Sequence, residues 1–126
     1  MTEKSIAVAL VIRGTDVLMV RRRDSAELQW QFPAGEIEPG ETPMEAATRE
    51  VLEETRVDCE SIRVVGERTH PITGRRLVYV ECSWIDGDPY VGDPDELDRA
   101  EWVQRTDVKN RIPSGLAPVV ADLLAT

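Results

Sequence analysis

The chain has 126 residues, and its 15 basic and 24 acidic side chains give it a formal net charge of −9. Its longest unbroken apolar run, Ile6–Ile12, is far shorter than the roughly 20 residues of a membrane-spanning helix, so we expect no membrane segment. The acidic balance disfavours nucleic acid as the main partner, because its phosphates would be repelled. The length predicts one domain over residues 1–126, and the composition leaves monomer and homodimer open.

Two β-rich runs begin the chain. Ile6–Ile12 and Val17–Arg22 flank the polar segment Arg13–Asp16, and this pattern predicts two strands joined by a hairpin turn. The first run lacks the flanking residues and the cleavage site of a signal peptide. Cys59 and Cys82 lack the spacing of a metal site, so we expect two reduced thiols in a cytoplasmic protein.

The stretch after the hairpin is predicted to form loops. Residues 24–29 are polar, and Trp30–Pro33 is a short aromatic segment. Ala34–Gly40 contains two glycines and a proline, which favour a turn-rich loop.

A helix is predicted from Thr42, its N-cap, to about Thr55. Glu45 lies three residues after Thr42 and completes a capping box. At 100° per residue, one side of this helix is predicted to face the core. That side comprises Met44, Ala47, Thr48, Val51 and Thr55.

The second half of the chain alternates apolar runs with turns. Its predicted elements are a strand at Ile62–Arg68, a turn at His70–Gly74, a strand at Leu77–Ile85, an acidic loop at 86–98, a strand at Glu101–Gln104, a helical turn capped by Thr106 and a helix at Leu116–Leu124. Together these elements predict a mixed sheet covered by helices on both faces, in the α/β (α+β) class.

Three glutamates are crowded on the central helix. Glu50, Glu53 and Glu54 are spaced i, i+3, i+4, so they project from one face of the helix. Like charges at this spacing repel, and near the helix C-terminus they also oppose the dipole. A solvated acidic face would tolerate this arrangement. A hard divalent cation would relieve it, because carboxylate oxygens suit Mg²⁺, Mn²⁺ and Ca²⁺.

The surroundings of these glutamates resemble the Nudix box. That pattern is Gly, five residues, Glu, seven residues, Arg-Glu, an aliphatic, any residue, Glu-Glu, any residue, Gly and an aliphatic. It covers residues 35–57 here, and the matching positions are Gly35, Glu41, Arg49, Glu50, Val51, Glu53, Glu54 and Val57. The departure is Arg56, where the pattern has the glycine that suits a left-handed residue at a helix end.

The resemblance implies a Nudix fold and Mg²⁺-dependent hydrolysis of a nucleoside diphosphate linked to another group, with Mn²⁺ as an alternative metal. A MutT-like pyrophosphohydrolase, which converts a nucleoside triphosphate to monophosphate and pyrophosphate, is the preferred interpretation. ADP-ribose or nucleotide-sugar pyrophosphatase activity is the alternative, as is a non-catalytic nucleotide-binding domain. By position, the implied metal ligands are the Ala34 carbonyl, Glu50, Glu53 and Glu54, and the implied orienting residues are Arg49 and Glu41.

Carboxylates are also expected to accept the proton of the attacking water. Glu53 is one candidate, and Glu96 in the acidic loop is the other, because some members of the resembled family place a glutamate there. Asp93 and Asp95 compete for the same role.

Substrate contacts are predicted from the end of the second strand and from the aromatic segment. Arg22 would contact a phosphate, as an arginine does in MutT-like enzymes. Trp30 and Phe32 are the candidates for stacking on a base.

Overall fold

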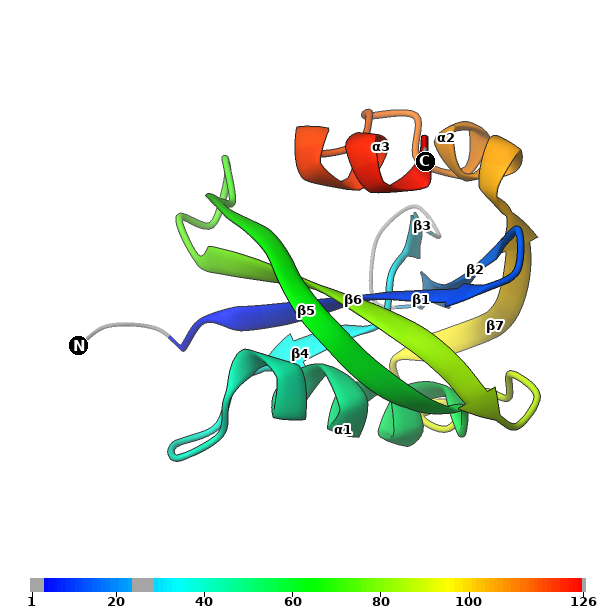
Figure 1. The fold of residues 1–126 in the computed structure, drawn as a ribbon, viewed down its shortest axis with the longest axis horizontal. Helices are drawn as coiled ribbons and strands as arrows, with labels where there is room; N and C mark the ends of the chain where they lie inside the picture. The colour runs from blue at the N-terminus through cyan, green and yellow to red at the C-terminus, as the bar shows by residue number, and fades with distance from the viewer. Residues whose placement is uncertain (1–3, 24–28, 126) are drawn as a thin grey trace.

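The computed structural model describes residues 4–23 and 29–125. They form a mixed seven-stranded sheet with helices on both faces, which confirms the predicted class (Figure 1). The strand order is β3-β2-β1-β6-β5, with β4 paired to β1 and β7 paired to β2. The elements are β1 (Ile6–Arg13), β2 (Asp16–Arg22), β3 (Gln29–Gln31), β4 (Ala34–Glu36), α1 (Pro43–Thr55), β5 (Asp58–Thr69), β6 (Arg76–Asp86), β7 (Leu97–Gln104), a 3₁₀ turn (Arg105–Asp107), α2 (Val108–Arg111) and α3 (Pro118–Leu124).

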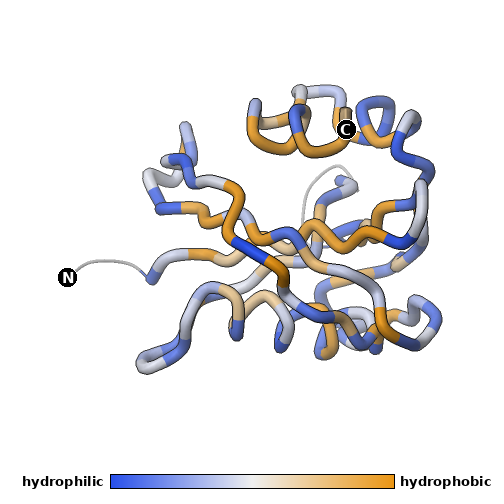
Figure 2. Tube along the Cα trace, in the orientation of Figure 1, coloured by the Kyte–Doolittle hydropathy of each residue, from blue (hydrophilic) through white to orange (hydrophobic). Residues whose placement is uncertain are grey.

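The central strand β1 divides the core into two layers. It pairs in parallel with β6, and successive side chains point to opposite faces of the sheet. Ala7 and Val11 pack in the layer that α1 covers, whereas Val8 and Leu10 pack in the layer that α3 covers. Figure 2 shows hydrophobic residues along the central strands and in α3. Strands buried on both faces read as continuous apolar runs, which explains Ile6–Ile12.

Helix α1 has the predicted ends. The Thr42 hydroxyl accepts a hydrogen bond from the Glu45 amide at 3.1 Å, and the Glu45 carboxylate accepts one from the Thr42 amide at 2.9 Å. The capping box is therefore complete, and the helix ends at Thr55.

The buried face of α1 differs in part from the prediction. Met44 and Thr48 are half-buried, whereas the fully buried set also includes one alanine and one glutamate that the periodicity left out. The buried residues are Ala46, Ala47, Val51, Glu54 and Thr55. The stripe is rotated because α1 packs against β4 as well as β1, β5 and β6.

Several element boundaries were wrong in the prediction. The expected loop at Ala34–Gly40 begins with β4, which pairs with the free edge of β1. β5 begins at Asp58, four residues before the predicted start at Ile62. The prediction missed these residues because register shifts break the alternation that marks a strand. β7 begins at Leu97 within the expected acidic loop, and Thr106 lies inside its 3₁₀ turn without capping it. The loop expected at 24–29 lies outside the described residues, apart from Gln29 in β3.

Both cysteines are buried free thiols, Cys59 in β5 and Cys82 in β6. Across residues 4–23 and 29–125, none of the helices is both long and apolar enough to cross a membrane.

The residue after α1 adopts the left-handed conformation that its position predicts. Arg56 has φ 65° and ψ 6°, and it is the non-glycine residue with positive φ in the described chain. Its amide donates to the Leu52 carbonyl at 3.0 Å, as at other left-handed helix ends.

Replacing Arg56 by glycine is expected to raise the free energy of unfolding by about 1 kcal/mol, because glycine has no Cβ to strain in this conformation. Urea denaturation measures the change. Arg56→Ala is the control, since it removes the charge and keeps the Cβ. Equal stability of the two variants would contradict the prediction.

Candidate active site

Arg49 forms ion pairs with three acidic residues of the site. Its guanidinium donates to both carboxylate oxygens of Glu41, at 2.8 and 2.9 Å, and to Glu50 at 2.7 Å. It also donates to Glu53 at 3.3 Å and to the Glu36 carbonyl at 3.0 Å. The bidentate contact lowers the pKa of Glu41 to about 2. Of the two predicted orienting residues, Arg49 therefore contacts two of the predicted metal ligands, and Glu41 contacts Arg49.

Glu54 is the buried carboxylate of the site, with 5% of its surface exposed. The Ala34 amide donates to it at 3.3 Å, which is a long contact for a buried charge. Burial, and then the nearby Glu50 charge, raise the pKa of Glu54 to about 8. Burial also raises the pKa of Glu50, against the influence of Arg49. Two such carboxylates together call for a compensating cation.

Gly35 lets the β4 backbone approach the helix closely. A Cβ at this position would overlap the carboxyl group of Glu50. A side chain here would displace the Glu50 carboxylate, so Gly35 lets β4 lie directly against the acidic face of α1, with Ala34 beside Glu54.

The acidic loop between β6 and β7 is bound to the C-terminal end of α1. The Gly92 amide donates to the Glu54 carbonyl at 2.8 Å, and the Tyr90 amide donates to the Thr55 carbonyl at 2.9 Å. These bonds satisfy carbonyls that a helix end leaves without partners. A Cβ on Gly92 would overlap the Glu53 carbonyl oxygen, so the loop depends on this glycine for its close approach.

Gly92→Ala is expected to lower the free energy of unfolding by about 2 kcal/mol, because the obstructing atom is backbone and cannot move aside. Hydrogen exchange at the Tyr90 amide is expected to accelerate as the loop separates from α1. Asp88→Ala is the control, since Asp88 is exposed in the same loop and already has a Cβ. Unchanged exchange at Tyr90 would show that the loop tolerates the extra carbon in place.

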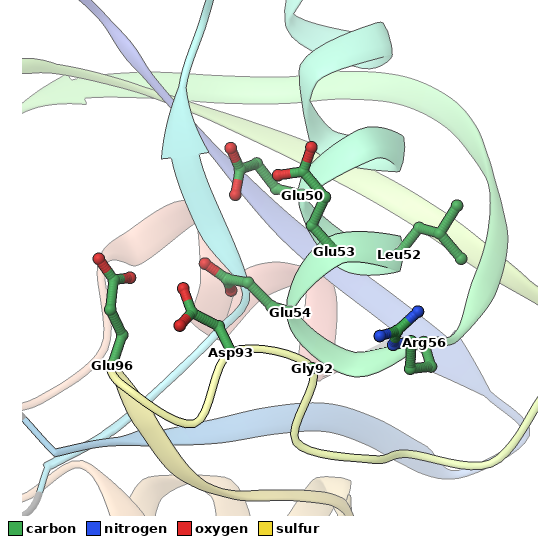
Figure 3. Close-up of a pocket in the computed structure, with 8 residues that line it drawn as sticks. All are labelled: Glu50, Leu52, Glu53, Glu54, Arg56, Gly92, Asp93 and Glu96. Carbon is green, nitrogen blue, oxygen red and sulfur yellow. The ribbon is translucent and has the colours of Figure 1, made fainter.

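The docked loop and α1 line an open pocket of about 490 Å³. Figure 3 shows the three helix glutamates with Asp93 and Glu96 of the loop facing them. The lining residues are Glu50, Leu52, Glu53, Glu54, Arg56, Gly92, Asp93 and Glu96. The structure thus brings Glu96 together with the predicted metal ligands, although more than 40 residues separate them in the chain. Asp95 does not line the pocket.

Sequence reasoning assigned no site role to three of these residues, Leu52, Gly92 and Arg56. The departure of Arg56 from the box pattern was the available signal for it. Gly92 carried a weaker signal, a glycine within an acidic loop. Leu52 occupies an unrestricted position of the pattern and had none.

The predicted substrate residues are divided between the two faces of the sheet. Arg22 forms an ion pair with Glu96 at 3.2 Å, beside the pocket. Trp30 packs with the core layer on the α3 side, where the guanidinium of Arg111 lies 4.3 Å from its ring centroid. Phe32 is in the same layer and 8% exposed, which leaves little of its ring for a ligand.

The donor set suits a hard divalent cation. Within the described residues, no three His, Cys, Asp or Glu side chains are already gathered as a metal cage. Glu50 and Glu53 are held by Arg49, while Glu54 is buried with a raised pKa. A bound divalent cation would neutralise the three carboxylates directly, so these residues fit such a cation.

Comparison with known proteins agrees with this geometry. A family model described as NUDIX domain matches residues 3–123. The chain belongs to the Nudix family. Nudix hydrolases generally use divalent metal ions, which is consistent with the acidic pocket.

Relatives in the Nudix family include proteins with different named activities. The NAD-capped RNA hydrolase NudC of Pseudomonas putida is 31% identical over 108 residues, which are 86% of this chain and 38% of that protein. This chain therefore spans less than two fifths of that relative's length.

Two solved structures share the fold. A Nudix hydrolase from Nitrosomonas europaea has a TM-score of 0.76 at 22% identity, covering 98% of this chain and 87% of that one. An Ap4A hydrolase from C. elegans has a TM-score of 0.78 at 17% identity, covering 96% of each chain.

Proposed function

We propose that this Nudix protein hydrolyses a nucleoside diphosphate linked to another group, using Mg²⁺. The observation that carries the proposal is the buried carboxylate of Glu54, which lies next to Glu50 in a pocket that Glu53 and Glu96 also line. Such crowding is unfavourable without a cation and is suited to one. A purely structural or sensory domain has no need of it.

Glu50, Glu53 and Glu54 would hold the metal, with the Ala34 carbonyl as a further ligand. When bound, the cation supplies charge neutralisation at the diphosphate and a lower pKa for an attacking water. Neutralisation is essential here, since a chain of net charge −9 must bind a polyanion.

Arg49 and Glu41 act as positioning residues. The fork of Arg49 sets the carboxylate of Glu50 in one orientation, and its bidentate contact with Glu41 holds the guanidinium in place. Fixed orientation matters because phosphoryl transfer depends mainly on alignment and charge stabilisation.

The proton of the attacking water would pass to Glu53 or Glu96. Glu53 is more than half exposed and weakly held by Arg49 at 3.3 Å. Glu96 is paired with Arg22 beside the pocket. Arg22 can also meet a substrate phosphate when that pair rearranges. A pH–rate profile of Glu96→Gln beside Glu53→Gln separates the two roles, because loss of the base removes the acidic limb.

A MutT-like substrate, a nucleoside triphosphate cleaved to monophosphate and pyrophosphate, is our first choice. ADP-ribose and nucleotide sugars are the alternatives. The acidic surface favours a small substrate over a long nucleic acid. Relatives named for NAD-capped RNA and Ap4A add those compounds to the test.

The test is phosphate, pyrophosphate and monophosphate release with and without Mg²⁺. The panel contains ordinary and oxidised nucleoside triphosphates, ADP-ribose, nucleotide sugars, NAD-capped RNA and Ap4A. Metal-dependent turnover of one group is the expected result. Nucleotide binding without turnover across the panel would instead favour a non-catalytic binding domain.

A further inference from the structure

Arg56 is the cationic side chain among the described residues that line the pocket. The other charged lining residues are all acidic: Glu50, Glu53, Glu54, Asp93 and Glu96. Figure 3 shows Arg56 beside Leu52 at the end of α1, on the side of the pocket away from Glu96. An arginine in this place departs from the glycine of the Nudix box.

The end of the helix does not require this side chain. The last carbonyls of α1 accept hydrogen bonds from backbone amides: Leu52 from Arg56, Glu54 from Gly92 and Thr55 from Tyr90. The backbone of Arg56 does cap the helix, but glycine would do so with less strain.

Ion pairing does not account for the arginine either. Its side chain is exposed, and within residues 4–23 and 29–125 it makes no hydrogen bond or ion pair. Arg49, by contrast, is engaged by three carboxylates. A strained position therefore carries a guanidinium that is available to a ligand.

We propose that Arg56 binds an anionic group of the substrate that lies beyond the diphosphate held at the helix glutamates. The inference rests on the proposed function and narrows its substrate class. Arg56 follows Glu53 by three residues and Glu54 by two, so an extended arginine reaches a phosphate next to one held there. A third phosphate fits this description, and a neutral sugar does not.

Binding of two analogues that resist hydrolysis tests the proposal. Isothermal calorimetry in Mg²⁺ compares α,β-methylene-ATP with α,β-methylene-ADP, which differ by one terminal phosphate. Arg56→Gly is expected to weaken binding of the triphosphate about tenfold and of the diphosphate less than twofold. Arg56→Lys should retain part of the difference. Arg63→Ala is the control for net charge, since Arg63 is exposed on β5 and does not line the pocket.

The binding data distinguish the role of Arg56 from the proposed function. Equal effects of Arg56→Gly on both analogues, or no effect on either, would overturn the role of Arg56 and leave the proposed function standing. Failure of the wild-type protein to bind either analogue would also overturn the role of Arg56, whereas the proposed function is decided by turnover across the whole panel. Misfolding is not a confounding cause, because Arg56→Gly is expected to be the more stable protein.

Discussion

Glu53→Gln and Glu54→Gln are each expected to lower turnover with Mg²⁺ by about 100- to 1000-fold. An amide keeps the size of the side chain but loses its charge, so the cation is held less tightly and substrate charge is less well neutralised. Glu54 should show the larger effect, because its buried position makes its charge more effective than that of the exposed Glu53. Steady-state kinetics on the substrate from the panel measures both.

Glu60→Gln is the matched control, since Glu60 is exposed on β5 and does not line the pocket. Its turnover should equal that of the wild-type protein. Thermal unfolding in the absence of metal should show that all three variants fold. Unchanged turnover in both Glu53→Gln and Glu54→Gln would refute the metal site.

The free energy of unfolding of the metal-free protein is expected to fall as the pH rises from 5 to 9. Glu54 has a pKa of about 8 in the folded protein and an ordinary value near 4.5 when unfolded. Between these values the folded state holds a proton that the unfolded state has released, so raising the pH favours unfolding. The loss is complete above pH 8 and amounts to at most about 5 kcal/mol.

Urea denaturation in chelator at pH 5.5, 7 and 9 measures this dependence. Glu54→Gln should abolish most of it and make the protein more stable than wild type at pH 9. Glu41 does not interfere, because its lowered pKa of about 2 places its contribution below pH 5. Glu50, whose pKa is also raised, acts in the same direction and leaves a small residual slope. Parallel pH curves for the two proteins would contradict the assignment.

Mg²⁺ provides an independent check of the same carboxylate. A ligand that binds the folded state stabilises it, so Mg²⁺ at pH 9 should restore stability to the wild-type protein. Glu54→Gln should gain much less. The pH dependence measures how much burying the Glu54 charge destabilises the metal-free protein. The Mg²⁺ effect measures how much the same charge contributes to metal binding.

Local rules predicted the elements that depend on neighbouring residues. The capping box of Thr42 and Glu45 is formed within one helical turn, so its geometry follows from the sequence. The glutamate spacing on α1 follows from the helical period in the same way. Even the left-handed Arg56 could be anticipated from its place in the box.

Longer-range pairing explains the predictions that failed. Ala34–Glu36 has no strong strand propensity, and it becomes β4 because β1 offers an unpaired edge there. Register shifts along β5 interrupt the strict alternation of side chains, so the prediction missed its first four residues. The base-stacking role of Trp30 stays a prediction; its ring packs against the core layer on the α3 side, with the Arg111 guanidinium over it.

The sequence by itself determined the acidic trio, the helix that carries it and the resemblance to the Nudix box, because these depend on residue type and spacing along one segment. The tertiary structure decided which carboxylate is buried, which loop closes the pocket and which arginine reaches it. Burial gives Glu54 its pKa of about 8, and Glu96 joins it because the Gly92 amide binds the loop to α1. The proximity of Glu50 follows from the helical period, but the desolvation of Glu54 is set by segments distant in the chain, so no local pattern contains it.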